Sequence, residues 1–171
     1  CLRTTPFEIW SHPKFNTTKS NMANFFQGAF RIVIDSNTVL GRSENLYSGI
    51  WDNVRNTEIP VLGTCAGAIL LSQNNLINAG IERNAFGRQR ESFQSEIDID
   101  LNGQSKYQGV FIRAPRFTAN SANAIAWLDG EVVGILERNI MALTFHPELT
   151  DDFRFHVWLL NEVQSKLQND Q

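Results

Sequence analysis

Cysteine is scarce in this chain: only Cys1 and Cys65 occur among its 171 residues. Two cysteines cannot build the dense disulfide framework of small secreted domains, so that class of scaffold is excluded. A single internal cysteine is either a small buried apolar residue or a nucleophile. Composition alone leaves both interpretations of Cys65 open.

Long apolar runs and an excess of basic residues are also lacking. No run approaches the ~18 apolar residues of a membrane-spanning helix, and the first residues lack the basic-then-apolar layout of a secretory signal. Fifteen Lys and Arg residues against 18 Asp and Glu residues give a net charge of -3, which offers a nucleic acid no electrostatic attraction. We therefore expect a cytoplasmic protein that binds neither membranes nor nucleic acids.

Apolar residues are sufficient for one folded domain, because hydrophobic residues make up 42% of the chain. Residues 1–21 show no sustained periodicity, and we expect an irregular N-terminal segment there, followed by a single domain over residues 22–171. Strands are predicted at 30–34, 58–63, 92–101, 109–112, 124–128, 131–136 and 140–145. Helices are predicted after Ser43, over Ala66–Gln73 and at the C-terminus. This succession predicts an α/β fold with a central mostly parallel or mixed sheet flanked by helices.

The C-terminal helix has the clearest pattern. Thr150 is predicted to cap it, and Asp151 and Asp152 favour its positive end. An apolar stripe follows at helical spacing and consists of Phe153, Val157, Leu160, Val163 and Leu167. A stripe of this kind packs a surface helix against a core.

The segment Gly63-Thr64-Cys65-Ala66-Gly67 joins a predicted strand directly to a predicted helix. This is the layout of a nucleophile elbow with cysteine in place of serine, because small residues on both sides allow a sharp turn. The helix start places its positive dipole and free N–H groups beside the sulfur, which favours the thiolate. The N–H of Ala66 is predicted to point to where an oxyanion forms. The pattern favours a nucleophilic Cys65 over a structural one.

A thiol nucleophile works with a base, and the chain offers three histidines: His12, His146 and His156. His12 lies in the unpatterned first segment, and His156 lies within the C-terminal helix, where a packing or surface role is expected. His146 follows a predicted buried strand, where catalytic loops emerge from α/β sheets. Pro147 keeps His146 out of helical geometry, and Glu148 is placed to turn back and hold the imidazole.

His-Pro-Glu alone has a simpler interpretation, a strand-to-helix turn with a surface carboxylate. Together with the cysteine elbow, the motif favours a catalytic triad of Cys65, His146 and Glu148.

Four blocks carry a family resemblance: residues 63–67 (GTCAG), 82–89 (ERNAFGRQ), 111–115 (FIRAP) and 145–152 (FHPELTDD). In these blocks the chain resembles the triad class of glutamine amidotransferases, and within it the glutaminase subunits of pyridoxal 5′-phosphate (vitamin B6) synthase. The second and third blocks are more specific than the elbow. The resemblance is nearly continuous from about residue 40 to residue 167, which is most of the chain.

The resemblance implies a role for each triad residue. Cys65 would attack the side-chain amide of glutamine and form a γ-glutamyl thioester. His146 would pass a proton to the departing ammonia and then activate water, while Glu148 orients it. The resemblance implies no metal or organic cofactor, since the thiol carries the chemistry. The implied partner is the synthase subunit that uses the ammonia.

The resemblance also implies a glutamine pocket, formed in part by Arg83, Ile112 and Arg113. An arginine can bind the α-carboxylate of a free amino acid with two hydrogen bonds. Surface salt bridges are the alternative for Arg83 and Arg113.

The front of the chain departs from this family. Members carry a Gly-Gly-Glu-Ser-Thr-Thr-x-Gly-Arg loop that supplies glutamine contacts and an oxyanion donor. Here Gly41-Arg42 matches its end, whereas the segment aligned with its start reads Ile34-Asp35-Ser36-Asn37-Thr38. One of two oxyanion donors is therefore unassigned, and losing one such donor typically costs about 10²–10³ in rate.

The altered front leaves a second hypothesis beside an active glutaminase. It is a non-catalytic relative that binds the synthase as a structural or regulatory subunit. The intact triad argues against that hypothesis. A third hypothesis, another cysteine-elbow hydrolase, is opposed by the two arginine-bearing blocks.

Overall fold

The computed structural model describes residues 32–34, 48–83, 92–120 and 122–169, and Arg31–Gln171 forms one compact unit. The expected irregular segment 1–21 and the boundary at residue 22 lie outside the described residues, as do Ser43 and His12. Within the described ranges, no helix combines the length and the apolarity that crossing a membrane requires.

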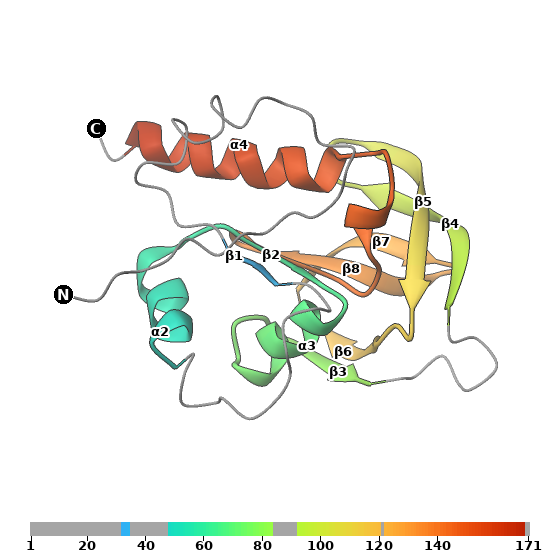
Figure 1. Cartoon of the computed structure of the whole chain (residues 1–171), viewed down its shortest axis with the longest axis horizontal. Coiled ribbons are helices and arrows are strands. Elements are labelled where there is room, and N and C mark those ends of the chain that lie inside the picture. Colours follow the sequence, from blue (N-terminus) through green and yellow to red (C-terminus); the bar gives the residue numbers. More distant parts are fainter. Residues whose placement is uncertain (1–31, 35–47, 84–91, 121, 170–171) are drawn as a thin grey trace. The chain divides into compact units, whose positions relative to one another are not determined.

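A mixed sheet of seven strands forms the centre of the described part of the chain (Figure 1). In spatial order the strands are β1 (Ile32–Ile34), β2 (Val61–Thr64), β9 (Ile140–Leu143), β8 (Glu131–Glu137), β7 (Asn123–Leu128), β4 (Ser92–Asp100) and β5 (Gln104–Ile112). β1, β2 and β9 run parallel, and each further neighbour along the sheet is antiparallel. The predicted α/β fold with a mixed sheet is thus confirmed.

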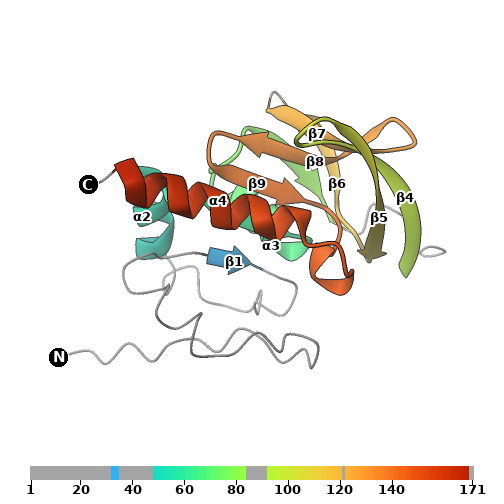
Figure 2. The ribbon, with the colours of Figure 1, turned by 90° about the horizontal axis from the view of Figure 1, so that it is seen from above.

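Helices cover both faces of this sheet (Figure 1). α4 (Arg154–Asn169) lies on one side, and α2 (Ser48–Thr57) and α3 (Ala66–Gln73) lie on the other. Figure 2 shows α4 lying across the sheet when it is seen from above. β3 (Ala79–Glu82) and β6 (Arg116–Asn120) form a separate two-stranded antiparallel sheet.

β2 and β9 are buried along their whole length, because both faces of the sheet are covered there. All four residues of β9 are buried, and they alternate between two cores. Met141 and Leu143 belong to the core under α4, together with Phe155 and Trp158. Ile140 and Ala142 belong instead to the core that contains residues of α2 and α3. The continuous apolar run therefore serves two packing layers at once.

The C-terminal helix differs from its prediction in both its start and its buried face. α4 begins at Arg154, whose N–H donates to the Asp152 carboxylate at 3.2 Å, and Thr150 does not cap it. Of the predicted stripe only Val163 is buried, whereas Phe153, Val157 and Leu167 are 38%, 49% and 39% exposed. The buried face consists of Phe155, Trp158, Leu159 and Val163.

Most predicted strands appear with shifted ends. β9 stops at Leu143, two residues earlier than predicted, and β5 begins at Gln104, five residues earlier. The alternation predicted for residues 92–101 is confirmed, because Ile97 and Ile99 are buried between exposed neighbours. β3 and β6 have no counterpart among the predictions.

Candidate active site

Cys65 occupies a strained turn between β2 and α3. Its φ of 48° and ψ of -104° lie outside the helical and extended regions, a strain that proteins tend to retain at functional sites. The Cys65 N–H donates to the Leu143 carbonyl of β9 at 2.8 Å, which fixes the turn to the sheet. The predicted elbow geometry is therefore present, with α3 starting at Ala66 directly after the sulfur-bearing residue.

Gly63 allows this close packing of strand and helix. A Cβ built on Gly63 would overlap the Leu71 Cδ1 atom and lie 3.1 Å from the backbone carbon of Gly67. Both neighbours belong to α3, so a side chain at residue 63 would push the helix away from β2 and displace the turn.

The second part of the site follows β9. The His146 N–H donates to the Val110 carbonyl of β5 at 2.8 Å, which carries the chain across the end of the sheet. His146 has an extended backbone (φ -111°, ψ 86°), and a 3₁₀ turn, η1 (Pro147–Leu149), begins directly after it. The prediction that Pro147 keeps His146 out of helical geometry is confirmed.

The imidazole of His146 is held by Glu148. Its Nδ1 atom lies 2.7 Å from the Glu148 Oε1 atom. His146 is only 2% exposed, and the Glu148 side chain is 24% exposed. A carboxylate at this distance accepts the Nδ1 proton, which leaves Nε2 as the nitrogen able to exchange a proton with a thiol.

The surroundings of His146 raise its pKa to about 9. Burial alone lowers the pKa, because it disfavours the charged imidazolium. The Cys65 sulfur and the Glu148 carboxylate both act in the other direction and outweigh it. Nε2 has no formed hydrogen bond among the described residues. The sulfur thus acts on the ring by close approach, and such contacts often tighten only when substrate binds.

The sulfur also contacts the backbone of β5. Cys65 Sγ lies 3.7 Å from the Ile112 carbonyl oxygen, to which the thiol donates a weak hydrogen bond. The next residue, Arg113, has a positive φ of 43°, which is an uncommon conformation for a residue with a side chain. Ile112 and Arg113 therefore lie beside the sulfur, where the resemblance places part of the glutamine pocket.

The two arginines of the expected pocket have exposed side chains. Arg83 follows the last residue of β3, Glu82, which pairs with Arg116 of β6. Neither Arg83 nor Arg113 forms an ion pair with any residue that the structure describes. The alternative that surface salt bridges occupy them thus gains no support in these ranges. Residues 84–91 lie outside the described part of the chain.

The segment that departs from the family pattern starts at the end of the sheet where Cys65 lies. Ile34, the last residue of β1, is the register partner of Gly63, two residues before Cys65. Residues 35–47, which include the segment aligned with the family's glycine loop, lie outside the described residues. In the described ranges, no three His, Cys, Asp or Glu side chains gather as a metal site would require.

Two features of the site were missed from the sequence. The carbonyl groups of Ile112 and Val110 contact Cys65 and His146, and no residue type signals such backbone contacts. Tyr107, which bonds to the turn behind Glu148, did have a signal. It is buried in alternation with Gly109 and Phe111, so extending the predicted strand by two residues would have included it.

Comparisons with known proteins identify the family of the chain. The SNO glutamine amidotransferase family matches residues 35–165. The chain is 41% identical over 142 residues to "Pyridoxal 5′-phosphate synthase subunit PdxT" of Methanococcus maripaludis, an alignment that covers 75% of this chain and 74% of that protein. It is 43% identical over 120 residues to the protein of the same name from Thermotoga neapolitana. That second alignment covers 64% of each chain, slightly less than two thirds of the relative's length.

A solved structure described as "Crystal structure of glutamine amidotransferase" has a TM-score of 0.65 and 33% sequence identity. The similarity covers 78% of this chain and 77% of that one. The family match spans most of the chain and includes the elbow and the His-Pro-Glu turn. This chain belongs to the SNO glutamine amidotransferase family.

Proposed function

We propose that this chain is a glutaminase subunit that hydrolyses L-glutamine to L-glutamate and ammonia. The observation that carries the proposal is the elbow sulfur of Cys65 beside an imidazole whose Nδ1 atom is held by Glu148 at 2.7 Å. The ammonia would pass to a synthase subunit that makes pyridoxal 5′-phosphate. The name of the similar PdxT proteins supports that partner.

In the first half of the proposed reaction, the Cys65 thiolate attacks the side-chain carbonyl carbon of glutamine. The C=O electron pair moves to oxygen and forms an oxyanion. Ala66 is the proposed donor to this oxyanion, because the first N–H groups of a helix have no intrahelical acceptor. The intermediate collapses when the C–N bond breaks and protonated His146 gives its Nε2 proton to the leaving nitrogen. Ammonia departs, and a γ-glutamyl thioester remains on Cys65.

In the second half, water replaces ammonia. His146, now neutral, removes a proton from the water as its oxygen attacks the thioester carbon. The second oxyanion collapses when the C–S bond breaks, which releases glutamate and restores the Cys65 thiolate beside protonated His146. One water is consumed, and one ammonia and one glutamate leave. Glu148 keeps the imidazole oriented through both halves.

Substrate recognition in this proposal uses Arg83, Ile112 and Arg113. The exposed guanidinium groups are suited to the α-carboxylate of glutamine, because neither forms an ion pair among the described residues. The backbone of Ile112 lies at the sulfur and is suited to contacts with the substrate near the reacting amide.

Labelling tests the proposal directly. A glutamine analogue with an electrophilic carbon in place of the side-chain amide should attach to Cys65, and free glutamine should slow the labelling. Peptide mass spectrometry locates the label, and release of glutamate and ammonia measures turnover. Label on Cys1, or label that persists in a Cys65→Ser variant, contradicts the assignment.

The second candidate function is a non-catalytic subunit of the same synthase. The observation that favours it is the sequence of the front segment, which lacks both glycines of the family loop. This candidate expects glutamine binding, or synthase binding, without release of ammonia.

A further inference from the structure

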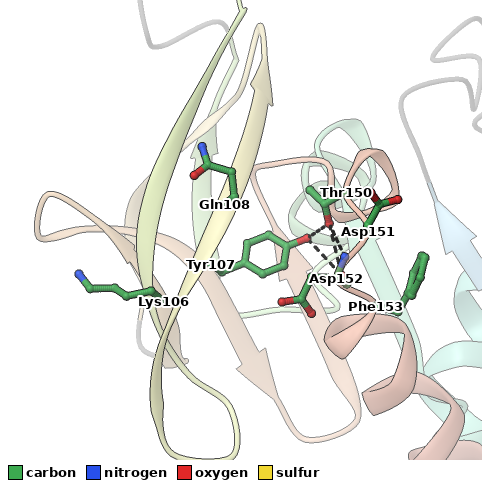
Figure 3. A pocket seen from close by; sticks show the side chains of 7 residues that line it. All are labelled: Lys106, Tyr107, Gln108, Thr150, Asp151, Asp152 and Phe153. Atoms are coloured by element: carbon green, nitrogen blue, oxygen red, sulfur yellow. Dashed lines mark hydrogen bonds between the residues drawn. The ribbon is translucent and has the colours of Figure 1, made fainter.

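Figure 3 shows a hydrogen-bonded pair of hydroxyl groups, those of Tyr107 and Thr150, and Thr150 directly follows the turn that carries Glu148. We propose that Tyr107 and Thr150 form a positioning pair, which fixes the turn Pro147–Leu149 and thereby holds the Glu148 carboxylate on His146. This inference rests on the proposed glutaminase function, since it assigns Tyr107 and Thr150 to the triad's support. Neither residue contacts the reacting atoms in the proposed mechanism.

The hydrogen bonds form a chain that leads from β5 to the turn. Tyr107 Oη lies 2.5 Å from Thr150 Oγ1, and the Thr150 hydroxyl donates to the Pro147 carbonyl at 3.0 Å. The Thr150 hydroxyl has one proton and two carbonyl acceptors within reach, Pro147 at 3.0 Å and Asp152 at 3.3 Å. When it donates to either carbonyl, the tyrosine hydroxyl is the donor in the shorter contact. The Thr150 N–H donates to the same Pro147 carbonyl at 3.2 Å. The side chain and the backbone N–H of Thr150 therefore both fix the peptide plane between Pro147 and Glu148.

That peptide plane sets the direction of Glu148, since the Pro147 carbonyl belongs to the peptide bond that begins Glu148. The carboxylate itself is weakly held. Its Oε1 atom binds His146, whereas its buried Oε2 atom has no hydrogen-bond partner among the described residues. A carboxylate with one bonded oxygen can rotate away from its partner. Its position relative to His146 thus depends on the backbone beneath it.

Tyr107 is a rigid anchor for this purpose. It lies within β5 and is paired with Ile97 of β4. Its buried ring packs against Phe145 and Phe155, with ring centroids 5.8 Å and 5.1 Å away. The Arg154 guanidinium lies 5.4 Å from the ring centroid. These contacts hold the ring on several sides, so the hydroxyl has a fixed direction.

The tyrosine hydroxyl also remains a donor over the working pH range. Burial raises the pKa of Tyr107 to about 12, and the hydrogen bond with Thr150 opposes this only in part. Asp152 and Glu148 raise the pKa further, and Arg154 lowers it. The phenol therefore keeps its proton at any pH well below 12.

A surface hollow beside the pair supplies a matched control. Lys106, Gln108, Asp151 and Phe153 line it together with Tyr107 and Thr150 (Figure 3). Gln108 neighbours Tyr107 in β5, but its side chain points away from the hydroxyl pair. A Gln108→Ala variant changes the same hollow and leaves the hydroxyl pair intact.

The test compares Tyr107→Phe and Thr150→Val with Thr150→Ser and Gln108→Ala, all in the full chain assayed with the synthase subunit. Losing one such hydrogen bond should lower kcat about fivefold and leave KM within about twofold. Thr150→Ser keeps the hydroxyl and should retain activity, as should Gln108→Ala. The double variant Tyr107→Phe/Thr150→Val should be no worse than Thr150→Val alone, since Thr150→Val already removes the contact with Tyr107 together with the bond to the Pro147 carbonyl.

NMR titration of the His146 ring supplies a readout that needs no turnover. Cys65 and Glu148 are the ionisable groups that raise the His146 pKa. Loosening Glu148 should therefore lower that pKa by about one, the size of change expected when one favourable charge interaction weakens. Tyr107→Phe that leaves both the His146 titration and kcat unchanged overturns the inference. An inactive wild-type chain whose His146 titration still shifts in Tyr107→Phe would reject the proposed function and keep the positioning pair.

Discussion

At the scale of single residues, the pKa of His146 sets the protonation state in which the site would meet glutamine in the proposed mechanism. A pKa near 9 means that the imidazole is protonated at neutral pH. In the proposed mechanism, a protonated Nε2 is the form that the departing ammonia needs. In that mechanism, the neighbours that raise the His146 pKa favour the proton donor of the first half, before a base is needed in the second.

The same pKa predicts a pH-dependent contribution to stability. The folded pKa of about 9 lies above the unfolded value near 6.5, so the stabilisation is fully present below pH 6.5 and is lost as the pH rises through 9. The loss is of the order of 3 kcal/mol in the free energy of unfolding. Urea unfolding of the wild type and of His146→Asn, at a pH just below 6.5 and at a pH just above 9, measures it.

The His146→Asn variant should lose this pH dependence of the free energy of unfolding, because asparagine does not titrate. Cys65→Ser should keep only the part that Glu148 causes. An equal pH dependence in the wild type and in His146→Asn contradicts the prediction.

A second prediction separates the two described histidines. His146→Asn should lower glutamine hydrolysis by at least about 10³-fold, because the proton donor and base are lost together. His156→Asn should keep hydrolysis within about twofold, as expected for a residue outside the reacting group. His156 lies in α4, partly exposed and with its ring 6.2 Å from that of Phe153. Steady-state kinetics with purified folded variants measures both, and equal loss in the two variants contradicts the distinction.

At the scale of elements, the local patterns were sufficient for most of the sheet. β2 and β9 are short apolar runs, and β4 alternates cleanly, so both kinds of strand are visible in the sequence. β3 carries no such pattern, because only Ala79 of its four residues is buried. The elbow and the His-Pro-Glu turn were predictable because glycine permits a sharp turn and a close approach, proline fixes its own φ, and a carboxylate two residues away can reach the imidazole.

The buried face of α4 was not predictable by spacing. Apolar residues occur on more than one side of this helix, and two sets of them fit a helical period. The sheet decides between them by contact: Phe155, Trp158 and Leu159 meet the core residues of β2 and β9. Residue spacing alone cannot identify the buried face of α4, because it describes the helix and not the surface against which the helix packs.

Two neighbouring residues of α4 test the corrected orientation. Trp158→Ala should lower the free energy of unfolding by about 3–5 kcal/mol, because a buried ring is lost from the core under α4. Val157→Ala should change it by less than about 0.5 kcal/mol, because Val157 is 49% exposed. Chemical denaturation measures both. A larger cost for Val157→Ala than for Trp158→Ala would restore the face that spacing predicts.

At the scale of the whole molecule, the described part of the chain carries the Cys65 elbow, the His146–Glu148 contact and a two-sided core, and the family match covers residues 35–165. What distinguishes this chain from the family pattern lies at the front. Ile34 and Asp35 stand where the resemblance expects the two loop glycines. A backbone N–H donor in such a loop depends on glycine when the required φ is positive or when the substrate approaches closely.

The last prediction concerns this front segment and turnover. If it lacks an oxyanion donor, the isolated chain should bind glutamine but hydrolyse it slowly, and the synthase subunit should raise kcat more than it changes KM. The double variant Ile34→Gly/Asp35→Gly should then raise kcat of the isolated chain, by up to about 10²–10³. Ile34→Gly alone is the control. Ile34 of β1 is the register partner of Gly63 of β2, so this single variant measures the loss of stability that replacing Ile34 causes. Full turnover by the unaltered isolated chain contradicts the prediction, and binding without turnover in every variant and in the complex favours the non-catalytic subunit.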